Sequence, residues 1–449
     1  MGPSASLEGR EVRSGLLNEA DLGSVPVADL FGFTQVMDPD ERRARLYAEA
    51  QVERHGDLRV WARRVRELQL SPGADVHLRR ARLKGACRHG VLPLLRPEVW
   101  ALLIGADDAF DDEKMLTGVA RPPFAGQGRG DGEPPSPGAT AATGLQSKDS
   151  EMKLAIEADL RRTFPEHTWL QSPRGQVSLR NVLVTFAVMR GDYCQGLSFI
   201  AATLLLALGR DEGRSIAALD ALLADSREGR LMRRFNSLQP EGSAAHYGPG
   251  ASLVPDTLFR HDLHGLLVEC AVLERLVVHK LPRIARRLDA LGCGVEVFAA
   301  EWFLTLFSSL LPADTCARVW DALLVEGFKV IHRVALALLT LHGDACVLDE
   351  VRVESAGDVA ALLKVALSRT HNHEHLMRTA FYGIGSFPTG RLEELRRSML
   401  ETSSSPSASP RKKLGKVASA RIQGYLDRIG LSTGHPGTPR KGPRAALWR

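Results

Sequence analysis

The stretch IEADLRRTFP, residues 156–165, carries the strongest structural signal in the chain. Asp159 and Arg162 stand three positions apart, so on a helix they lie on one face and can form an ion pair. Pro165 disfavours the helical conformation at Phe164, which predicts that Arg162 lies in the last turn of its helix. A carboxylate that orients a guanidinium at a helix end suits phosphate recognition. A surface salt bridge explains the same spacing and, on spacing alone, is the favoured interpretation.

A second informative stretch, YCQGLSFIAA, covers residues 193–202. Asp192 is suited to an N-cap position, and Gln195, three residues later, is suited to a capping box. A competing interpretation is that Tyr193, Gln195 and Gly196 open an apolar, buried helix, and that Gly196 lets another backbone approach closely. Taken alone, this stretch leaves both interpretations open.

The rest of the chain predicts an all-helical protein. Of the 449 residues, 44% are hydrophobic and 25% are charged, as in ordinary globular proteins. Only 6% are aromatic, while Ala, Leu and Arg, which favour helices over strands, are abundant. In AEWFLTLFSSLLP, residues 300–312, apolar side chains recur at helical spacing in a row from Trp302 through Leu306 to Leu310. No period of about 20 to 50 residues recurs, so we expect irregularly stacked helices rather than a solenoid.

Composition and turn signals divide the chain into a disordered N-terminus, a helical arm, a main domain and a disordered tail, at residues 1–25, 26–78, 79–400 and 401–449. The helix of the arm is expected to start at Asp38-Pro39, an N-cap followed by a proline at the first helical position. Two Gly- and Pro-rich stretches of the main domain, at about 106–150 and 236–256, are expected to be flexible insertions.

The tail makes the chain basic. From Thr402 onward, ten Lys and Arg residues are opposed by one acid, Asp427, so this segment has a net charge of +9. Because the whole chain has a net charge of +5, the remainder of the chain is acidic. Weak attraction to acidic membrane surfaces is one role for such a tail. A solvated tail without that role is the favoured alternative.

In combination and in this order, these stretches resemble the TBC domain family of Rab GTPase-activating proteins. IEADLRRTFP is similar to that family's I-x-x-D-x-x-R-T-x-P motif, and YCQGLSFIAA is similar to its Y-x-Q-G-M motif. LRPEVWALLIG resembles its R-x-x-x-W motif, and EWFLTLF with RVWDALLVEG resembles its later helices. The resemblance covers roughly residues 79–381. The matching positions are Ile156, Asp159, Arg162, Thr163, Tyr193, Gln195, Gly196, Arg96, Trp100, Trp302, Trp320 and Asp321.

The resemblance implies a stacked-helix fold that activates a GTP-bound Rab-family GTPase in trans. Arg162 would neutralise charge on the transferred phosphoryl group, Gln195 would position the attacking water, and Asp159 would orient Arg162. Arg96 and Trp100 would brace the fold. The chain would not itself be an enzyme and would need no cofactor, because GTP and Mg²⁺ would be bound by the GTPase. The implied setting is vesicle trafficking and intracellular protein transport, in the cytoplasm and at the periphery of endomembranes.

An alternative interpretation is a TBC fold that binds a Rab GTPase as an effector or scaffold without accelerating hydrolysis. The presence of both Arg162 and Gln195 favours the activator, since a pure binding module needs neither side chain. A helical scaffold unrelated to GTPases is a third interpretation, which the set of motifs opposes.

Other kinds of site are not indicated by the sequence. The six cysteines stand singly without a C-x-x-C pair, so we expect buried free thiols rather than a zinc or redox site. The histidines of HNHEH, residues 371–375, lack an evident fourth ligand and are expected to be solvated. The longest apolar stretch, residues 197–209, is too short to cross a bilayer. GQGRGDG lacks the lysine of a phosphate-binding loop, and no nucleic-acid partner is expected.

Overall fold

A computed structural model describes residues 26–29, 31–55, 61, 63, 76–104, 142–223, 253–260 and 263–404. The predicted disordered N-terminus, most of the two predicted insertions and the tail beyond residue 404 lie outside these ranges.

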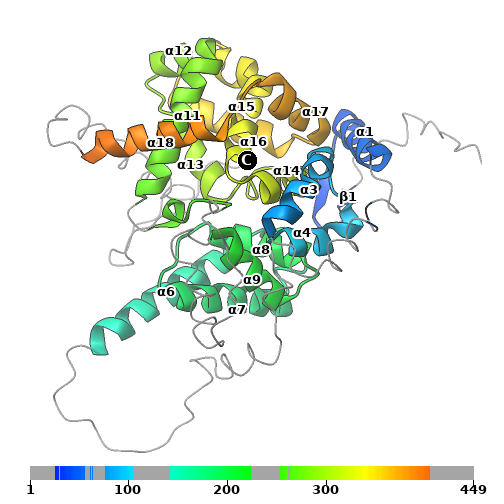
Figure 1. Ribbon diagram of the computed structural model, residues 1–449, viewed down its shortest axis with the longest axis vertical. Coiled ribbons are helices and arrows are strands. Elements are labelled where there is room, and N and C mark those ends of the chain that lie inside the picture. Colours follow the sequence, from blue (N-terminus) through cyan, green and yellow to red (C-terminus); the bar gives the residue numbers. More distant parts are fainter. Residues whose placement is uncertain are drawn as a thin grey trace, which may run out of the picture.

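The described residues are mostly helical, as the composition predicts (Figure 1). The first group of helices is α1 (Pro39–His55), α3 (Val76–His89), the short η2 (Pro93–Leu95) and α4 (Arg96–Ile104). The second group is α6 (Ala142–Arg162), α7 (Pro173–Arg190), α8 (Leu197–Ala207) and α9 (Glu212–Leu223). The third group is η3 (Asp256–Phe259), α11 (His264–Lys280), α12 (Pro282–Ala290), α13 (Glu296–Leu304), α14 (Ala313–Glu326), α15 (Lys329–Gly343), η4 (Asp344–Leu348), α16 (Ala356–Ser368), α17 (His373–Arg378), η5 (Thr379–Gly383) and α18 (Thr389–Ser404).

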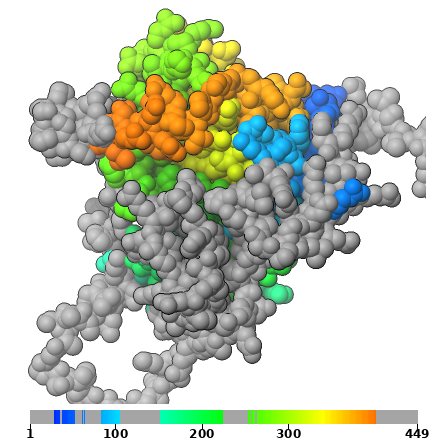
Figure 2. Space-filling model, in the orientation of Figure 1, coloured from blue at the N-terminus to red at the C-terminus, as the bar shows by residue number. Residues whose placement is uncertain are grey.

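The helices form two stacked halves around one continuous apolar core. In Figure 1, α6 to α9 lie in the lower half and α11 to α18 in the upper half. Helix α4 contacts both α9 and α14, so it joins the two halves. In the same orientation, Figure 2 shows α18, in orange, lying across the surface of the upper half. Its Arg396 side chain reaches the buried Glu269 carboxylate of α11, at 2.7 and 3.1 Å.

A buried polar cluster fixes α4 against α14. The two Asp321 oxygens each accept one hydrogen bond from Arg96, from Nε and Nη2, at 3.2 Å. They also accept from Trp100 Nε1, at 2.9 Å, and from the backbone N–H of Val91, at 3.0 Å. The Trp100 and Trp320 rings stack beside it with centroids 5.8 Å apart. The carboxylate is thus fully hydrogen-bonded, which is the condition for burying a charge without a large penalty.

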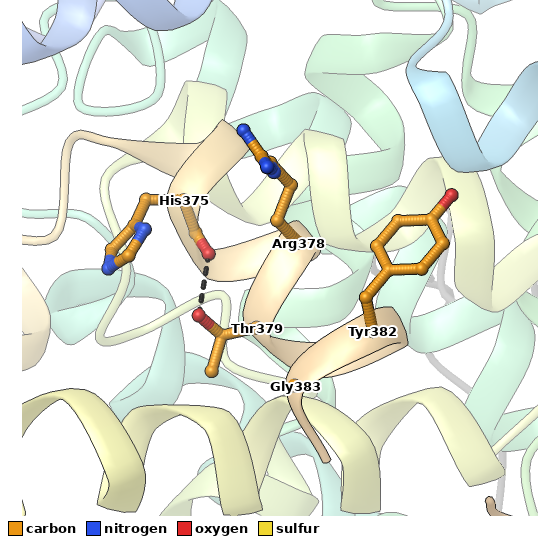
Figure 3. Close-up of a pocket in the computed structure, with 5 residues that line it drawn as sticks. All are labelled: His375, Arg378, Thr379, Tyr382 and Gly383. Carbon is orange, nitrogen blue, oxygen red and sulfur yellow. Dashed lines mark hydrogen bonds between the residues drawn. The ribbon is translucent and has the colours of Figure 1, made fainter. Parts of the chain in front are cut away.

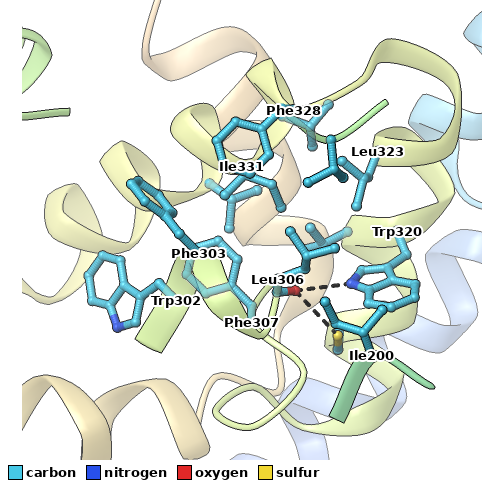
Figure 4. Close-up of a cluster of buried hydrophobic side chains, with 14 of the residues drawn as sticks. Ile200, Trp302, Phe303, Leu306, Phe307, Trp320, Leu323, Phe328 and Ile331 are labelled. Carbon is cyan, nitrogen blue, oxygen red and sulfur yellow. Dashed lines mark hydrogen bonds between the residues drawn. The ribbon is translucent and has the colours of Figure 1, made fainter. Parts of the chain in front are cut away.

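The predicted single helical row from Trp302 to Leu310 is wrong, although all its members are buried. Helix α13 ends at Leu304, and Leu306 and Phe307 adopt positive φ angles of 50° and 66°. This turn presents the Leu306 carbonyl oxygen to Trp320 Nε1, which donates to it at 3.0 Å (Figure 4). The bend therefore fills the core and satisfies the buried indole N–H at the same time.

Several boundaries differ from the predicted ones. Helix α6 begins at Ala142, inside the predicted insertion, because no proline follows Pro137 in that stretch. The predicted helical arm, residues 26–78, opens with a short antiparallel hairpin, β1 (Pro26–Ala28) and β2 (Thr34–Val36), and its helix α1 begins at Pro39, where the sequence predicts it. Helix α18 continues to Ser404, past the predicted start of the tail.

The longest apolar helix is not the predicted one. Lys329–Leu348 is a continuous helical segment of 20 residues, long and apolar enough by length and composition to cross a membrane. In the fold 72% of its most apolar window is buried, and α15 packs against α13, α14, α16 and α17. It is therefore accounted for as a core helix.

Candidate functional site

The candidate site begins at the C-terminal end of α6. This helix ends at Arg162, and Phe164 adopts a left-handed φ of 47° immediately before Pro165. Gln171 Nε2 donates to the carbonyl oxygens of Thr163, at 3.0 Å, and Phe164, at 3.3 Å. These bonds pair the Thr163 carbonyl oxygen beyond the helix end and add to the bond that the Phe164 carbonyl oxygen accepts from the His167 backbone N–H. The Arg162 side chain, 27% exposed, thus projects from a helix end that is held in place.

The buried Asp159 carboxylate joins the two informative stretches of sequence. Arg162 Nη2 pairs with its Oδ1 atom, and the Tyr193 hydroxyl donates to its Oδ2 atom at 2.6 Å. The backbone N–H of Gly196 donates to the same carboxylate. The Asp159 side chain of α6 therefore binds the arginine and a residue on either side of Gln195, Tyr193 two positions before it and Gly196 directly after it.

The protonation states in this cluster follow from burial. Burial raises the pKa of Asp159 above its ordinary value, and this effect exceeds the opposing influence of Arg162 and of the hydrogen bonds from Tyr193 and Gly196. Burial, together with the neighbouring Asp159 charge, raises the pKa of Tyr193 well above its ordinary value. The phenol therefore remains a hydrogen-bond donor throughout the physiological pH range.

The loop that carries Gln195 is shaped by Gly196. Helix α8 begins at Leu197 with Gly196 as its N-cap, at a φ of 100°. The predicted capping box of Asp192 and Gln195 is therefore wrong, because the left-handed glycine starts the helix after both residues. A Cβ on Gly196 would lie 3.3 Å from the Leu304 carbonyl oxygen, so another backbone does approach closely here, as predicted.

Two polar atoms of this cluster are buried without a hydrogen-bond partner among the described residues. They are Arg162 Nε and Gln195 Oε1. Leaving such an atom unpaired costs about 1 to 3 kcal/mol. A donor and an acceptor of the two stretches thus have unused hydrogen-bonding capacity.

A second contact ties the two stretches together. Thr163 Oγ1 lies 2.7 Å from Ser198 Oγ on α8 and 2.7 Å from the Asp159 carbonyl oxygen. Ile156, one turn before Asp159 on α6, is buried in the core. Sequence reasoning missed Ser198 and Gln171; a polar residue inside the apolar run 197–209 was the available signal for Ser198.

The other predicted positions lie elsewhere. Arg96, Trp100, Trp320 and Asp321 form the α4–α14 cluster, and Trp302 packs in the core between Phe298 and Phe307. These residues position helices and are not brought to the Asp159 cluster by any hydrogen bond of the described residues.

The histidine prediction is wrong for two of its three members. His371 and His373 are buried rather than solvated. Burial, followed by the nearby Arg318, lowers the pKa of His373 to about 3, so this imidazole is neutral. Among the described residues, no group of three or more His, Cys, Asp or Glu side chains could hold a metal ion. All six cysteines are buried free thiols, as predicted.

A shallow hollow occurs on a different part of the surface. It is lined by five residues of α17 and η5, namely His375, Arg378, Thr379, Tyr382 and Gly383 (Figure 3). These helices lie in the upper half, whereas α6 to α8 form the lower half. The hollow is therefore separate from the Asp159 cluster.

Comparison with known proteins identifies the family. The family model of the Rab-GTPase-TBC domain matches residues 93–240 and 251–346, which is more than half of the chain. The chain belongs to this TBC family. The matched ranges contain the Asp159 cluster and the α4–α14 cluster, and they exclude the hairpin, α1 and α3 on one side and α16 to α18 on the other.

Relatives cover most of this TBC chain. Growth hormone-regulated TBC protein 1 of Xenopus tropicalis is 30% identical over 331 residues, which span 72% of this chain and 79% of that protein. The Homo sapiens protein of the same name is 28% identical over 331 residues, spanning 73% and 81%. The crystal structure of the Chlamydomonas flagellar RabGAP TBC domain superposes with a TM-score of 0.54 at 27% identity, covering 79% of this chain and 99% of that one. The resemblance drawn from the sequence is confirmed, and the family's kind of partner is a Rab GTPase.

Proposed function

We propose that this TBC chain accelerates GTP hydrolysis by a GTP-bound Rab-family GTPase and that Arg162 and Gln195 complete the GTPase's catalytic site. The observation that carries the proposal is the Asp159 carboxylate, which holds Arg162, the Tyr193 hydroxyl and the Gly196 backbone at once. This arrangement ties the arginine to the loop that carries Gln195.

Arg162 would act on the charge of the transferred phosphoryl group. Its pairing with Asp159 uses Nη2, and Nε has no partner among the described residues, so the guanidinium retains donors for phosphate oxygens. An arginine supplied in trans accelerates GTP hydrolysis by roughly 10³ to 10⁵, or about 4 to 7 kcal/mol of barrier. Asp159 lowers the entropic cost of using it by fixing its direction before the GTPase arrives.

Gln195 would orient the attacking water. Its Oε1 atom has no partner among the described residues, so no hydrogen bond of that atom has to be broken when the side chain turns out of its buried position to accept from the water. A carboxamide can accept from water through this oxygen and donate through its nitrogen, which is the role that the catalytic glutamine of small GTPases plays. GTP and Mg²⁺ would be bound by the GTPase, and the chain would act in the cytoplasm or at the periphery of endomembranes.

The test is single-turnover GTP hydrolysis by a panel of preloaded Rab GTPases. The wild-type chain should accelerate at least one of them, and Arg162→Ala should return the rate to within about tenfold of the intrinsic rate. Arg161→Ala is the matched control, because Arg161 is the exposed neighbour on the same turn of α6 and should be dispensable. Gln195→Ala should lower the maximal rate while the GTPase still binds.

Two outcomes would contradict the proposal. One is the absence of acceleration for every Rab, and the other is full activity of Arg162→Ala. Binding of a GTP-loaded Rab without acceleration would instead support the effector or scaffold.

A further inference from the structure

The N-terminal hairpin lies against the segment that follows the arginine. Strands β1 and β2 pair in antiparallel register, with Ala28 opposite Thr34, and the turn between them is closed by Asp29. Its Oδ1 atom accepts hydrogen bonds from the backbone N–H groups of Phe31 and Phe33, both at 2.9 Å, and its own N–H donates to the Phe33 carbonyl oxygen at 2.9 Å. These hydrogen bonds fix Phe31 and Phe33 relative to Asp29 at the tip of the hairpin.

The tip meets the arginine segment through aromatic contacts. The Phe33 and Phe164 rings form a T-shaped pair, with an interplanar angle of 78° and centroids 4.9 Å apart. Phe33 forms a second T-shaped pair with the His167 ring, at 80° and 4.5 Å. Phe164 also contacts Phe199 of α8, at 89° and 5.2 Å. Edge-to-face pairs of this kind contribute about 0.5 to 1.5 kcal/mol each beyond area burial.

A hydrogen bond fixes the hairpin to the same segment. His167 Nδ1 accepts from the backbone N–H of Leu170 at 3.1 Å, so the neutral ring carries its proton on Nε2. Nε2 then donates to the Phe31 carbonyl oxygen at 2.8 Å, across 136 positions of sequence. The buried imidazole therefore links the hairpin to the turn after α6.

Phe164 is the residue through which this contact would reach Arg162. It stands two positions after Arg162 and has a φ of 47°. A left-handed conformation costs a bulky L-residue of order 1 to 3 kcal/mol and persists only where the surroundings hold it. Phe33 and Phe199 hold the ring, and Gln171 holds the carbonyl oxygen at 3.3 Å. Phe33 is the only one of these three that comes from outside the residues matched by the family model.

We propose that the hairpin tip is a positioning element for Arg162, with Phe33 as its acting residue. By holding Phe164, Phe33 fixes the direction in which the chain leaves α6 and so the direction of the arginine. It sets the maximal rate of hydrolysis rather than the affinity for the GTPase. This inference rests on the proposed activation of a Rab GTPase.

The test compares Phe33→Ala with wild type on a Rab that the wild-type chain accelerates. We expect the maximal rate to fall about 10- to 100-fold, the loss typical of a displaced catalytic group, with a KM within about threefold of wild type. Phe33→Tyr, which keeps the ring, should retain the wild-type maximal rate. Tyr47→Ala is the control in the same N-terminal segment, because Tyr47 is 53% exposed on α1.

Double variants separate positioning from a general loss of structure. In an Arg162→Ala background, Phe33→Ala should have no further effect on the maximal rate. In a Gln195→Ala background its effect should persist. A structural defect would lower the rate in both backgrounds. If thermal unfolding shows that Phe33→Ala does not fold, Phe33→Leu, which keeps apolar bulk without the ring, takes its place.

The outcomes distinguish this inference from the proposed function. If the wild-type chain accelerates no Rab, both are overturned. If wild type is active and Phe33→Ala keeps its maximal rate, or loses only affinity, the hairpin inference alone is overturned.

Discussion

Replacing Tyr193 with phenylalanine removes one oxygen atom from the middle of the candidate site. The Tyr193 side chain is buried, and its hydroxyl donates to Asp159 Oδ2 at 2.6 Å. The ring of phenylalanine occupies the same space, so the change deletes a hydrogen bond without opening a large cavity. Asp159 would keep Arg162 and the Gly196 N–H as partners.

The magnitude follows from the charge of the acceptor. A hydrogen bond to a charged group contributes about 1.5 to 3 kcal/mol, and this is the expected loss in the free energy of unfolding. At about 2 to 4 °C per kcal/mol, the unfolding midpoint should fall by roughly 3 to 12 °C. Since Tyr193 stands two positions before Gln195, the maximal rate of the stimulated GTPase should also fall, by about tenfold, while KM stays near wild type.

Urea titration and single-turnover hydrolysis measure the two effects of Tyr193→Phe. Tyr47→Phe removes the same atom from a residue that is 53% exposed on α1, and should change neither quantity. If the free energy of unfolding of Tyr193→Phe stays within about 0.5 kcal/mol of wild type, as for ordinary surface substitutions, the hydrogen bond does not hold the site together.

Three further predictions concern single side chains. Gly196→Ala places a Cβ 3.3 Å from the Leu304 carbonyl oxygen at a φ of 100°, so it should destabilise by about 1 to 3 kcal/mol in urea titration and lower the maximal rate. Burial, and after it the negative charge of Asp314, raises the pKa of Asp29 from 3.8 to about 6. The contribution of Asp29 to the free energy of unfolding is therefore fully present below pH 3.8 and is lost as the pH rises through 6. Asp29→Asn, which keeps an acceptor oxygen, should flatten that dependence and stabilise the fold at pH 7 by at most about 3 kcal/mol in urea titrations across this range. Burial alone would raise the pKa of Glu326, but hydrogen bonds from Arg88 and Lys329 lower it from 4.5 to about 2. The charged Glu326 therefore stabilises the fold above pH 4.5, and this stabilisation is lost as the pH falls through 2. Glu326→Gln should therefore lower the thermal midpoint at pH 7 and reduce its loss on acidification.

Local features of the site follow from the sequence. Pro165 predicts the end of α6, and the three-residue spacing predicts that Asp159 and Arg162 can pair, because both depend only on the geometry of one helix. The position of the glycine in YCQG predicts a close approach, although the capping-box alternative assigned the wrong start to α8. Helical periodicity likewise predicts the fold class.

Contacts between distant segments do not follow from spacing. The Tyr193 hydroxyl reaches Asp159 across 34 positions, and Arg96 reaches Asp321 across 225. His373 is buried by packing between helices, and this burial, followed by the neighbouring arginines, lowers its pKa to about 3. The hairpin escapes prediction because each strand has three residues, too few for the alternation that identifies a strand.

The free-energy cost of the Asp159 cluster favours catalysis over passive binding. The raised pKa of Asp159 means that burial of this carboxylate costs more than its partners return. Two polar atoms that have no partner in the described part of the chain, Arg162 Nε and Gln195 Oε1, add to that cost. Buried ion pairs can often be replaced by apolar side chains with no loss of stability. A surface that only binds a GTPase could therefore dispense with this cluster, whereas an activator needs a charged and an amide side chain held ready before the GTPase binds.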